Sequence, residues 1–104
     1  MKYGLKDDTV SKIQAVLISY PEVEKAILYG SRAKGNFKPA SDIDITLTGQ
    51  MLSLDILNRI ELDLDDLLLP YKIDLSIFQL IKNEDLINHV KKEGATLYSK
   101  LSYN

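Results

Sequence analysis

LYGSRAKGNFKPASDIDITL, residues 28–47, is the stretch of sequence that decides the fold. Its apolar start stops at Gly30 and Ser31, where a residue without a side chain and a short hydroxyl let backbone amides close on an anion. A phosphate group is the anion that such a turn most commonly binds. Acidic and branched apolar residues then alternate over residues 41–45, SDIDI, with the two-residue period of a β-strand. The stretch therefore predicts a strand, an anion-binding turn and a second strand.

Asp42 and Asp44 are predicted to point to the same side of that second strand, because successive side chains alternate between the two faces. Two carboxylates about 4 Å apart repel each other by roughly 4 kcal/mol at an effective dielectric constant near 20. A hard divalent cation between them offsets this repulsion, and oxygen ligands beside a phosphate site favour Mg²⁺. The pair therefore predicts a magnesium site next to the anion-binding turn.

The segment GSRAKG at residues 30–35, followed by SDID at residues 41–44, resembles the signature of nucleotidyltransferases of the DNA polymerase β superfamily. Either half alone would be weak evidence, but both in this order and at this spacing form a specific motif. The short chain is similar throughout to the minimal nucleotidyltransferase (MNT) branch. The family more often has Arg where Lys34 stands, and an ammonium lacks the planar donor geometry of a guanidinium. The resemblance implies that a nucleotide is bound by Gly30, Ser31, Arg32, Lys34 and Ser41.

A third acidic residue, Asp74, interrupts a predicted strand over residues 71–78 that is otherwise expected to be well buried. In the superfamily a carboxylate on the neighbouring strand joins the Asp-x-Asp pair, and Asp74 stands at the matching position. The resemblance therefore implies that Asp42, Asp44 and Asp74 are the catalytic and metal-binding residues. The alternative is that Asp74 only pairs with a nearby basic side chain such as Arg32.

Length and composition favour a single domain spanning residues 1–104, and the resemblance implies that it is a minimal nucleotidyltransferase domain. Thirteen basic residues against fifteen acidic ones argue against a broad basic surface that would bind nucleic acid without regard to sequence. The chain has no cysteine, no signal-peptide pattern and no apolar run near the roughly 20 residues needed to cross a bilayer. These observations predict a cytoplasmic protein without a disulfide framework, a thiolate zinc site or a membrane span.

The expected order of elements is helix, strand, short helix, strand, helix, strand, helix. Ser53 and Asn83 are predicted to cap the last two long helices, and Gly35 to stop the short one. The other expected ranges are a helix over residues 8–20, with its cap among Asp7, Asp8 and Thr9, and a strand over residues 22–30. This order predicts an α/β (α+β) fold with a small three-stranded sheet covered by helices on one face. The resemblance implies the polymerase β-like palm, whose sheet is mixed.

Several polar residues are given structural interpretations. The acidic residues between Asp55 and Asp66 are read as the solvated face of a helix rather than a metal cluster. His89, the single histidine, is interpreted as a surface or half-buried helix residue rather than a base. Residues 95–104, which include Leu97 and Tyr103, either pack on the core or form a partner surface, and the sequence does not choose between them.

The resemblance implies an activity and a partner. MNT proteins are similar to the antitoxins of HEPN–MNT pairs, so the expected reaction is Mg²⁺-dependent transfer of AMP from ATP to a tyrosine of a HEPN toxin, with two metal ions. Two alternatives remain open. The chain could neutralise its partner by covering it without catalysis, or it could be a small-molecule nucleotidyltransferase of the aminoglycoside-modifying kind.

Overall fold

The structure is a computed structural model that describes residues 2–102. Its first half contains α1 (Asp7–Ile18), β1 (Lys25–Tyr29), the short helix α2 (Ser31–Lys34) and β2 (Ile43–Thr48). Its second half contains α3 (Leu54–Asp65), β3 (Ile73–Ile77), α4 (Glu84–Glu93) and β4 (Ala95–Ser99), with 3-10 turns η1 (Phe78–Leu80) and η2 (Lys100–Ser102). No helix in this part of the chain has the length and apolar content to cross a bilayer.

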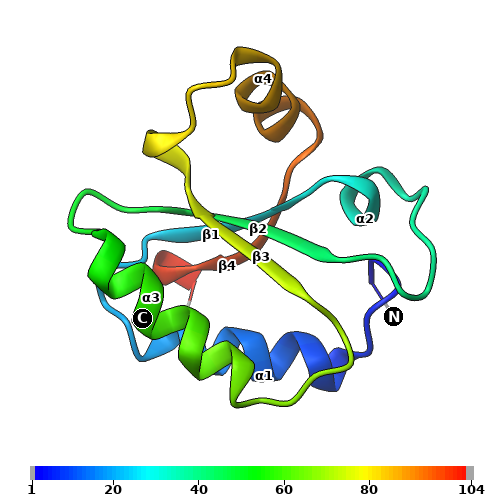
Figure 1. Ribbon diagram of the computed structural model, residues 1–104, viewed down its shortest axis with the longest axis horizontal. Helices are drawn as coiled ribbons and strands as arrows, with labels where there is room; N and C mark the ends of the chain where they lie inside the picture. Colours follow the sequence, from blue (N-terminus) through cyan, green and yellow to red (C-terminus); the bar gives the residue numbers. More distant parts are fainter. Residues whose placement is uncertain (1, 103–104) are drawn as a thin grey trace.

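The four strands form one mixed sheet in the order β3-β2-β1-β4 (Figure 1). β1 is antiparallel to both of its neighbours, whereas β2 and β3 are parallel and are connected through α3. The predicted α/β class and mixed sheet are confirmed, but the expectation of three strands is wrong. Residues 95–99 form the fourth strand because their backbone pairs with the free edge of β1 and buries Leu97 and Tyr98. Tyr103 lies outside the described residues.

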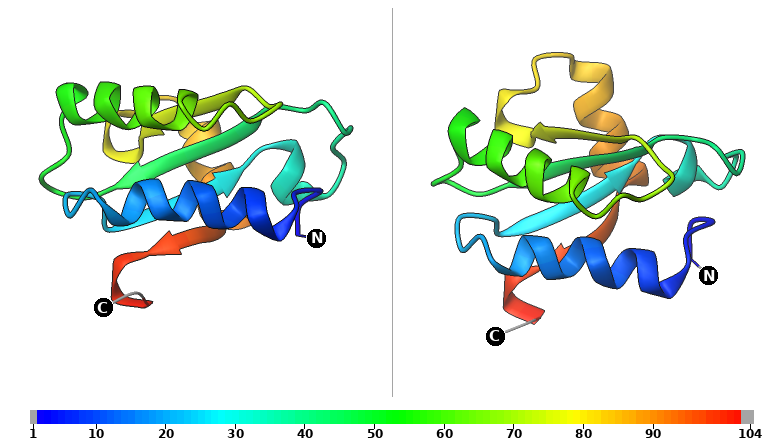
Figure 2. Two further views of the ribbon diagram at one scale, coloured as in Figure 1. Left: turned by 90° about the horizontal axis from the view of Figure 1, so that it is seen from below. Right: turned by 60° about the horizontal axis from the view of Figure 1, so that its bottom comes forward.

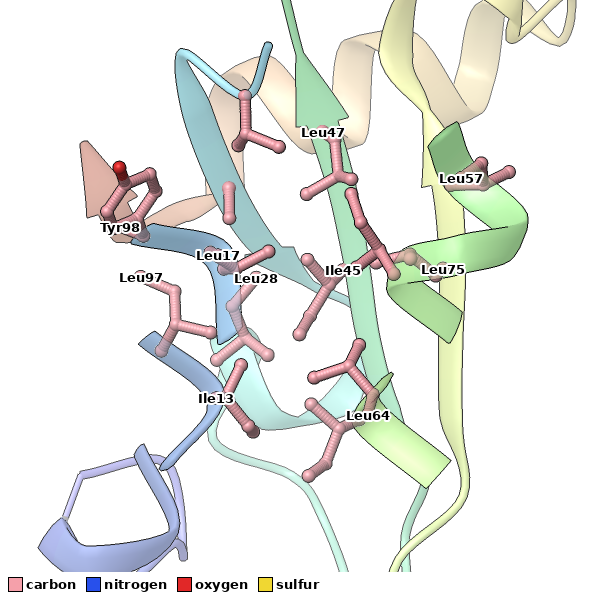
Figure 3. Close-up of a cluster of buried hydrophobic side chains, with 14 of the residues drawn as sticks. Ile13, Leu17, Leu28, Ile45, Leu47, Leu57, Leu64, Leu75, Leu97 and Tyr98 are labelled. Atoms are coloured by element: carbon pink, nitrogen blue, oxygen red, sulfur yellow. The ribbon is translucent and has the colours of Figure 1, made fainter. Parts of the chain in front are cut away.

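The helices cover both faces of the sheet, so the prediction that they share one face is also wrong. Helices α1 and α3 lie side by side on one face, whereas α4 lies on the other (Figures 1 and 2). The apolar core fills the space between the sheet and the α1–α3 pair (Figure 3), and it includes Ile13, Leu17, Leu28, Ile45, Leu57, Leu64, Leu75 and Leu97. Helix α4 is held elsewhere because Val90 is buried and Gly94 packs closely against Ile27, whose side chain points away from that core.

Local signals explain most of the element ends. The hydroxyl of Ser53 accepts a hydrogen bond from the Ile56 amide, and the Asn83 side chain accepts one from the Leu86 amide, so both predicted caps are confirmed. Gly35 ends α2 with φ +88°, as predicted. Helix α1 differs, because it begins at Asp7 after Lys6, which provides no side-chain cap. Asp7 and Asp8 in its first turn instead stabilise the helix, because their negative charges lie near the positive end of the helix dipole.

Candidate active site

The candidate site lies where β1 ends and β2 begins, on the sheet face that carries α4. Tyr29, the last residue of β1, pairs with Asp44 of β2, and Asp44 pairs in turn with Asp74 of β3. Because residues at one register position of a sheet present their side chains to the same face, the three form a row across the strands. The next row along these strands contains Thr46 and Ser76, whose hydroxyls are 2.9 Å apart and hydrogen-bonded.

Asp44 is the half-buried member of the acidic group, while Asp42 and Asp74 are exposed. Burial raises the pKa of the Asp44 carboxyl above its ordinary value of 3.8, and the charges of Asp74 and Asp42 raise it further. Both acids therefore lie close enough to repel Asp44, and a cation at this place would offset that repulsion. Asp42 itself stands just before β2, in the connection that follows α2.

The corner predicted to hold phosphate is formed by Gly30 and Ser31 at the junction of β1 and α2. Gly30 has φ +76° and ψ −153°, a region that is open almost only to glycine. A Cβ added there would stand 2.3 Å from Oδ2 of Asp44. The corner and the carboxylate are thus in close contact, and the close approach requires a residue without a side chain.

Replacing Gly30 with Ala is expected to abolish nucleotidyl transfer, because the added methyl group must displace the Asp44 carboxylate. Gly35→Ala is the matched control: it places Ala at φ +88°, but nothing lies within 4 Å of its Cβ. Both variants should lose stability through backbone strain of about 1–3 kcal/mol. Transfer assays paired with thermal unfolding separate the two effects. Equal activity in folded Gly30→Ala and Gly35→Ala would contradict the proposed contact.

Arg32, predicted to bind the nucleotide, is buried to 1% exposure. Its Nη1 donates a hydrogen bond to the Tyr3 carbonyl at 2.9 Å, and its Nη2 donates to the Ser41 and Pro39 carbonyls at 2.8 and 3.2 Å. Its Nε also donates to Ser41, at 3.1 Å. These bonds tie α2 to the N-terminal segment and to the connection that leads into Asp42. A role of Arg32 in nucleotide binding stays a prediction.

The Arg32 guanidinium also stacks on two aromatic rings. Its central carbon lies 5.2 Å from the ring centroid of Phe37 and 4.9 Å from that of Tyr71, within the range of cation–π contacts. Within the described residues, the hydrogen bonds of Arg32 all go to backbone carbonyls, and none goes to Asp74. The alternative in which Asp74 merely pairs with Arg32 is therefore wrong.

The remaining predicted nucleotide ligands differ in their surroundings. Lys34 is exposed on α2, free to reach toward an anion, while Ser31 is half-buried at the start of that helix. The Ser41 hydroxyl accepts a hydrogen bond from the Lys38 amide at 2.8 Å and so stabilises the connection before β2. The structure brings Gly30 against Asp44, but the nucleotide contacts of Ser31, Lys34 and Ser41 stay predictions.

A metal ion would have to be held by carboxylates from two strands. Within residues 2–102 no three acidic or histidine side chains are gathered into a group that could hold a metal ion. The donors nevertheless fit Mg²⁺ in kind, because they are carboxylate oxygens whose charges repel. The acidic residues of α3 form no metal group either, and Asp63 accepts a hydrogen bond from the Tyr20 hydroxyl at 2.5 Å.

Two residues near the corner have positions that sequence reasoning missed. His89 of α4 is half-buried, as predicted, but its Nε2 accepts a hydrogen bond from the Gly30 amide at 2.9 Å. Its ring meets that of Tyr29 edge-on, with centroids 6.2 Å apart. Burial raises the pKa of the Tyr29 hydroxyl, and a hydrogen bond with Ser76 opposes that effect. No local pattern predicts these contacts, because they depend on α4 folding back over the end of β1.

Comparison with known families agrees with this geometry. The family model described as polymerase beta, nucleotidyltransferase, matches residues 11–102. The chain belongs to this nucleotidyltransferase family. The resemblance of the GSRAKG and SDID segments to the polymerase β superfamily is thereby confirmed. No curated protein matches the chain.

Solved structures with this nucleotidyltransferase fold include several toxin–antitoxin complexes. A chain of a toxin–antitoxin crystallised with AMP-PNP has a TM-score of 0.69 and 21% identity, covering 95% of this chain and 77% of that one. A chain of the complex between the tri-AMPylated Shewanella oneidensis HEPN toxin and its MNT antitoxin has a TM-score of 0.68 and 20% identity, covering 95% of this chain and 76% of that one. A chain of a MntA toxin–antitoxin complex that carries two aspartate-to-glutamate substitutions has a TM-score of 0.68 and 19% identity, covering 95% of this chain and 77% of that one. At these identities the likeness establishes the fold.

Proposed function

We propose that this chain is a magnesium-dependent nucleotidyltransferase that transfers AMP from ATP to a tyrosine hydroxyl of a HEPN toxin and thereby acts as its antitoxin. The observation that carries the proposal is the row in which Asp44 and Asp74 are neighbours on parallel strands, with Asp44 against Gly30. Membership of the nucleotidyltransferase family gives that row its chemistry. The structural neighbours suggest an adenine nucleotide and a HEPN toxin as the modified partner, and the choice of a tyrosine follows from the family resemblance.

In the proposed reaction the tyrosine oxygen bonds to the α-phosphorus of ATP while the bond to the β-phosphate oxygen breaks. Pyrophosphate leaves, and the hydroxyl proton passes to solvent. Asp42 and Asp44 would hold Mg²⁺ against the triphosphate, and Asp74 would help to hold a second ion. The ions supply positive charge that stabilises the attacking and leaving oxygens. The amides of Gly30 and Ser31 would position the phosphate chain, so the protein's contribution is mainly orientation.

The relation to the solved complexes supports the choice of acidic residues. One neighbouring complex bears glutamate in place of two aspartates separated by a single residue, which is the spacing of Asp42 and Asp44. Another contains a HEPN toxin modified three times by AMP. We extend both features to this chain as part of the proposal.

The test uses intact-mass measurement of the protein encoded by the neighbouring reading frame, purified with this chain and incubated with ATP and Mg²⁺. The expected result is one or more adenylate-sized mass increments on the partner, and none when EDTA removes the metal. A partner that is bound but never gains mass contradicts the proposal.

The same preparation discriminates the two alternatives. Steric neutralisation predicts that inhibition of the toxin survives the double change Asp42→Ala with Asp44→Ala. A small-molecule nucleotidyltransferase predicts turnover of aminoglycosides with ATP by this chain without a protein partner. The proposed protein-modifying reaction predicts that the double variant loses inhibition and that aminoglycosides stay unmodified.

A further inference from the structure

The Gly30 amide is already engaged in this structure, although the proposed reaction needs it for phosphate. Its N–H donates to Nε2 of His89 at 2.9 Å, a normal length for a hydrogen bond. Nε2 is therefore the acceptor in this hydrogen bond and is not available to another donor while the bond persists. His89 therefore occupies the direction from which a phosphate oxygen would approach this amide.

Gly30 has little freedom to turn its amide toward a different acceptor. Its carbonyl accepts a hydrogen bond from the Lys34 amide at 3.1 Å, which holds it to the first turn of α2. The Asp44 carboxylate lies against its α-carbon, and its φ of +76° is fixed between β1 and α2. An anion that takes the Gly30 N–H must therefore displace the imidazole.

The His89 side chain is the partner whose displacement disturbs least, because Gly30 is held by α2 and by its contact with Asp44. His89 stands on the site-facing side of α4, next to the buried Val90, and contacts Tyr29 only through an edge-on ring arrangement. Rotation of the side chain, or a small shift of α4, releases the Gly30 amide without breaking a strand pairing. One backbone N–H makes one strong hydrogen bond, so the histidine and the phosphate exclude each other there.

We infer that His89 competes with a nucleotide phosphate for the Gly30 amide and so sets the affinity of the site for nucleotide. The inference rests on the proposed function, since it takes the phosphate chain of a nucleoside triphosphate to be the competing ligand. Helix α4 is thereby coupled to occupancy: it is bonded to the corner without nucleotide and released from it with nucleotide. His89 is a positioning residue and takes no part in the chemical step.

The substitutions His89→Phe and His89→Gln separate the acceptor from the bulk of the side chain. Phe keeps a ring that can meet Tyr29 but has no acceptor, whereas the Gln carbonyl can still accept from Gly30. Calorimetric titration with AMP-PNP and Mg²⁺ is expected to show His89→Phe binding about three- to tenfold more tightly than wild type, the range for one net hydrogen bond. His89→Gln should stay within about twofold of wild type, since it keeps an acceptor.

A second measurement needs no substitution. In ¹⁵N-labelled wild-type protein, saturation with AMP-PNP and Mg²⁺ is expected to break the hydrogen bond from Gly30 to His89. The Nε2 resonance of His89 should then move toward the value of an imidazole nitrogen that accepts no hydrogen bond. The Gly30 amide resonance should move with it. Thermal unfolding shows whether each variant is folded. If His89→Phe folds poorly, the resonance shifts of the wild-type protein decide the question.

The outcomes separate the inference from the proposed function. The inference alone is overturned if His89→Phe leaves nucleotide binding unchanged or weakens it. It is also overturned if the hydrogen bond between Gly30 and His89 persists when nucleotide saturates the protein. Absence of AMP-PNP binding in wild type and both variants overturns the proposed function, and the inference falls with it. Binding that appears only in His89→Phe supports the inference strongly, since it identifies the imidazole as the obstacle.

Discussion

Replacing Asp44 with Asn is expected to abolish nucleotidyl transfer and, at neutral pH, to raise the stability of the nucleotide-free protein. Asn keeps the shape of the side chain but removes the charge that faces Asp74, so transfer should fall by about a thousandfold or more, as when one major electrostatic contact is lost from an active site. Transfer is measured by intact mass of the partner. Stability is measured by thermal unfolding without nucleotide or metal.

The gain in stability follows from the direction of the Asp44 pKa. Burial and the neighbouring acids raise that pKa above 3.8, so the folded state holds the proton more tightly than the unfolded chain does. The contribution of Asp44 to the free energy of unfolding therefore falls as pH rises from 3.8 through the raised pKa. Asp44→Asn removes this loss, so its advantage should be present at neutral pH and vanish below pH 3.8.

Glu61→Gln is the matched control for the Asp44 variant. Glu61 is an exposed acid on α3, on the opposite side of the sheet. Its substitution should change neither transfer nor, beyond about 0.5 kcal/mol, the free energy of unfolding. Near-normal transfer by Asp44→Asn would remove the basis for placing catalysis at this row of carboxylates.

Replacing Arg32 with Ala is expected to lower the free energy of unfolding by about 3–5 kcal/mol, the range for breaking a buried charged network. The change leaves the Tyr3, Pro39 and Ser41 carbonyls without their donor and empties the space beside two aromatic rings. Urea unfolding measures the loss. Arg32→Lys should fall between wild type and Ala, because an ammonium keeps the charge but not the planar donors.

Lys34→Ala is the internal comparison for Arg32, since both basic residues belong to α2 and only Lys34 is exposed. Its effect on the free energy of unfolding should stay within about 0.5 kcal/mol. If Arg32→Ala proved as stable as Lys34→Ala while losing nucleotide affinity, Arg32 would be a nucleotide ligand and its buried network would be wrong.

The ends of several helices could be predicted from the sequence because they depend only on neighbouring residues. The glycine that ends α2 and the two helix caps follow from side-chain chemistry within a few positions. The placement of Asp44 beside Asp74 followed from the family resemblance and was confirmed by the parallel pairing of β2 and β3.

Features that depend on distant segments were not predictable in the same way. The segment ATLYS at residues 95–99 has no clean alternation, and it becomes a strand because β1 offers an unpaired edge. The Arg32 side chain lies in a motif associated with phosphate, yet carbonyls and rings from separate segments enclose it. The His89 contact likewise exists only once α4 crosses the sheet face opposite α1 and α3.

The central position of β1 between β2 and β4 matters for how the protein is made. During synthesis the ribosome releases β2 soon after β1, but β4 emerges only after α3, β3 and α4. Strand pairings between segments far apart in a chain form slowly, and an unpaired edge in a growing polypeptide invites aggregation or chaperone binding. The strand that delivers Gly30 therefore gains its second neighbour only after β4 has emerged, and one edge of β1 stays unpaired while α3, β3 and α4 are being made.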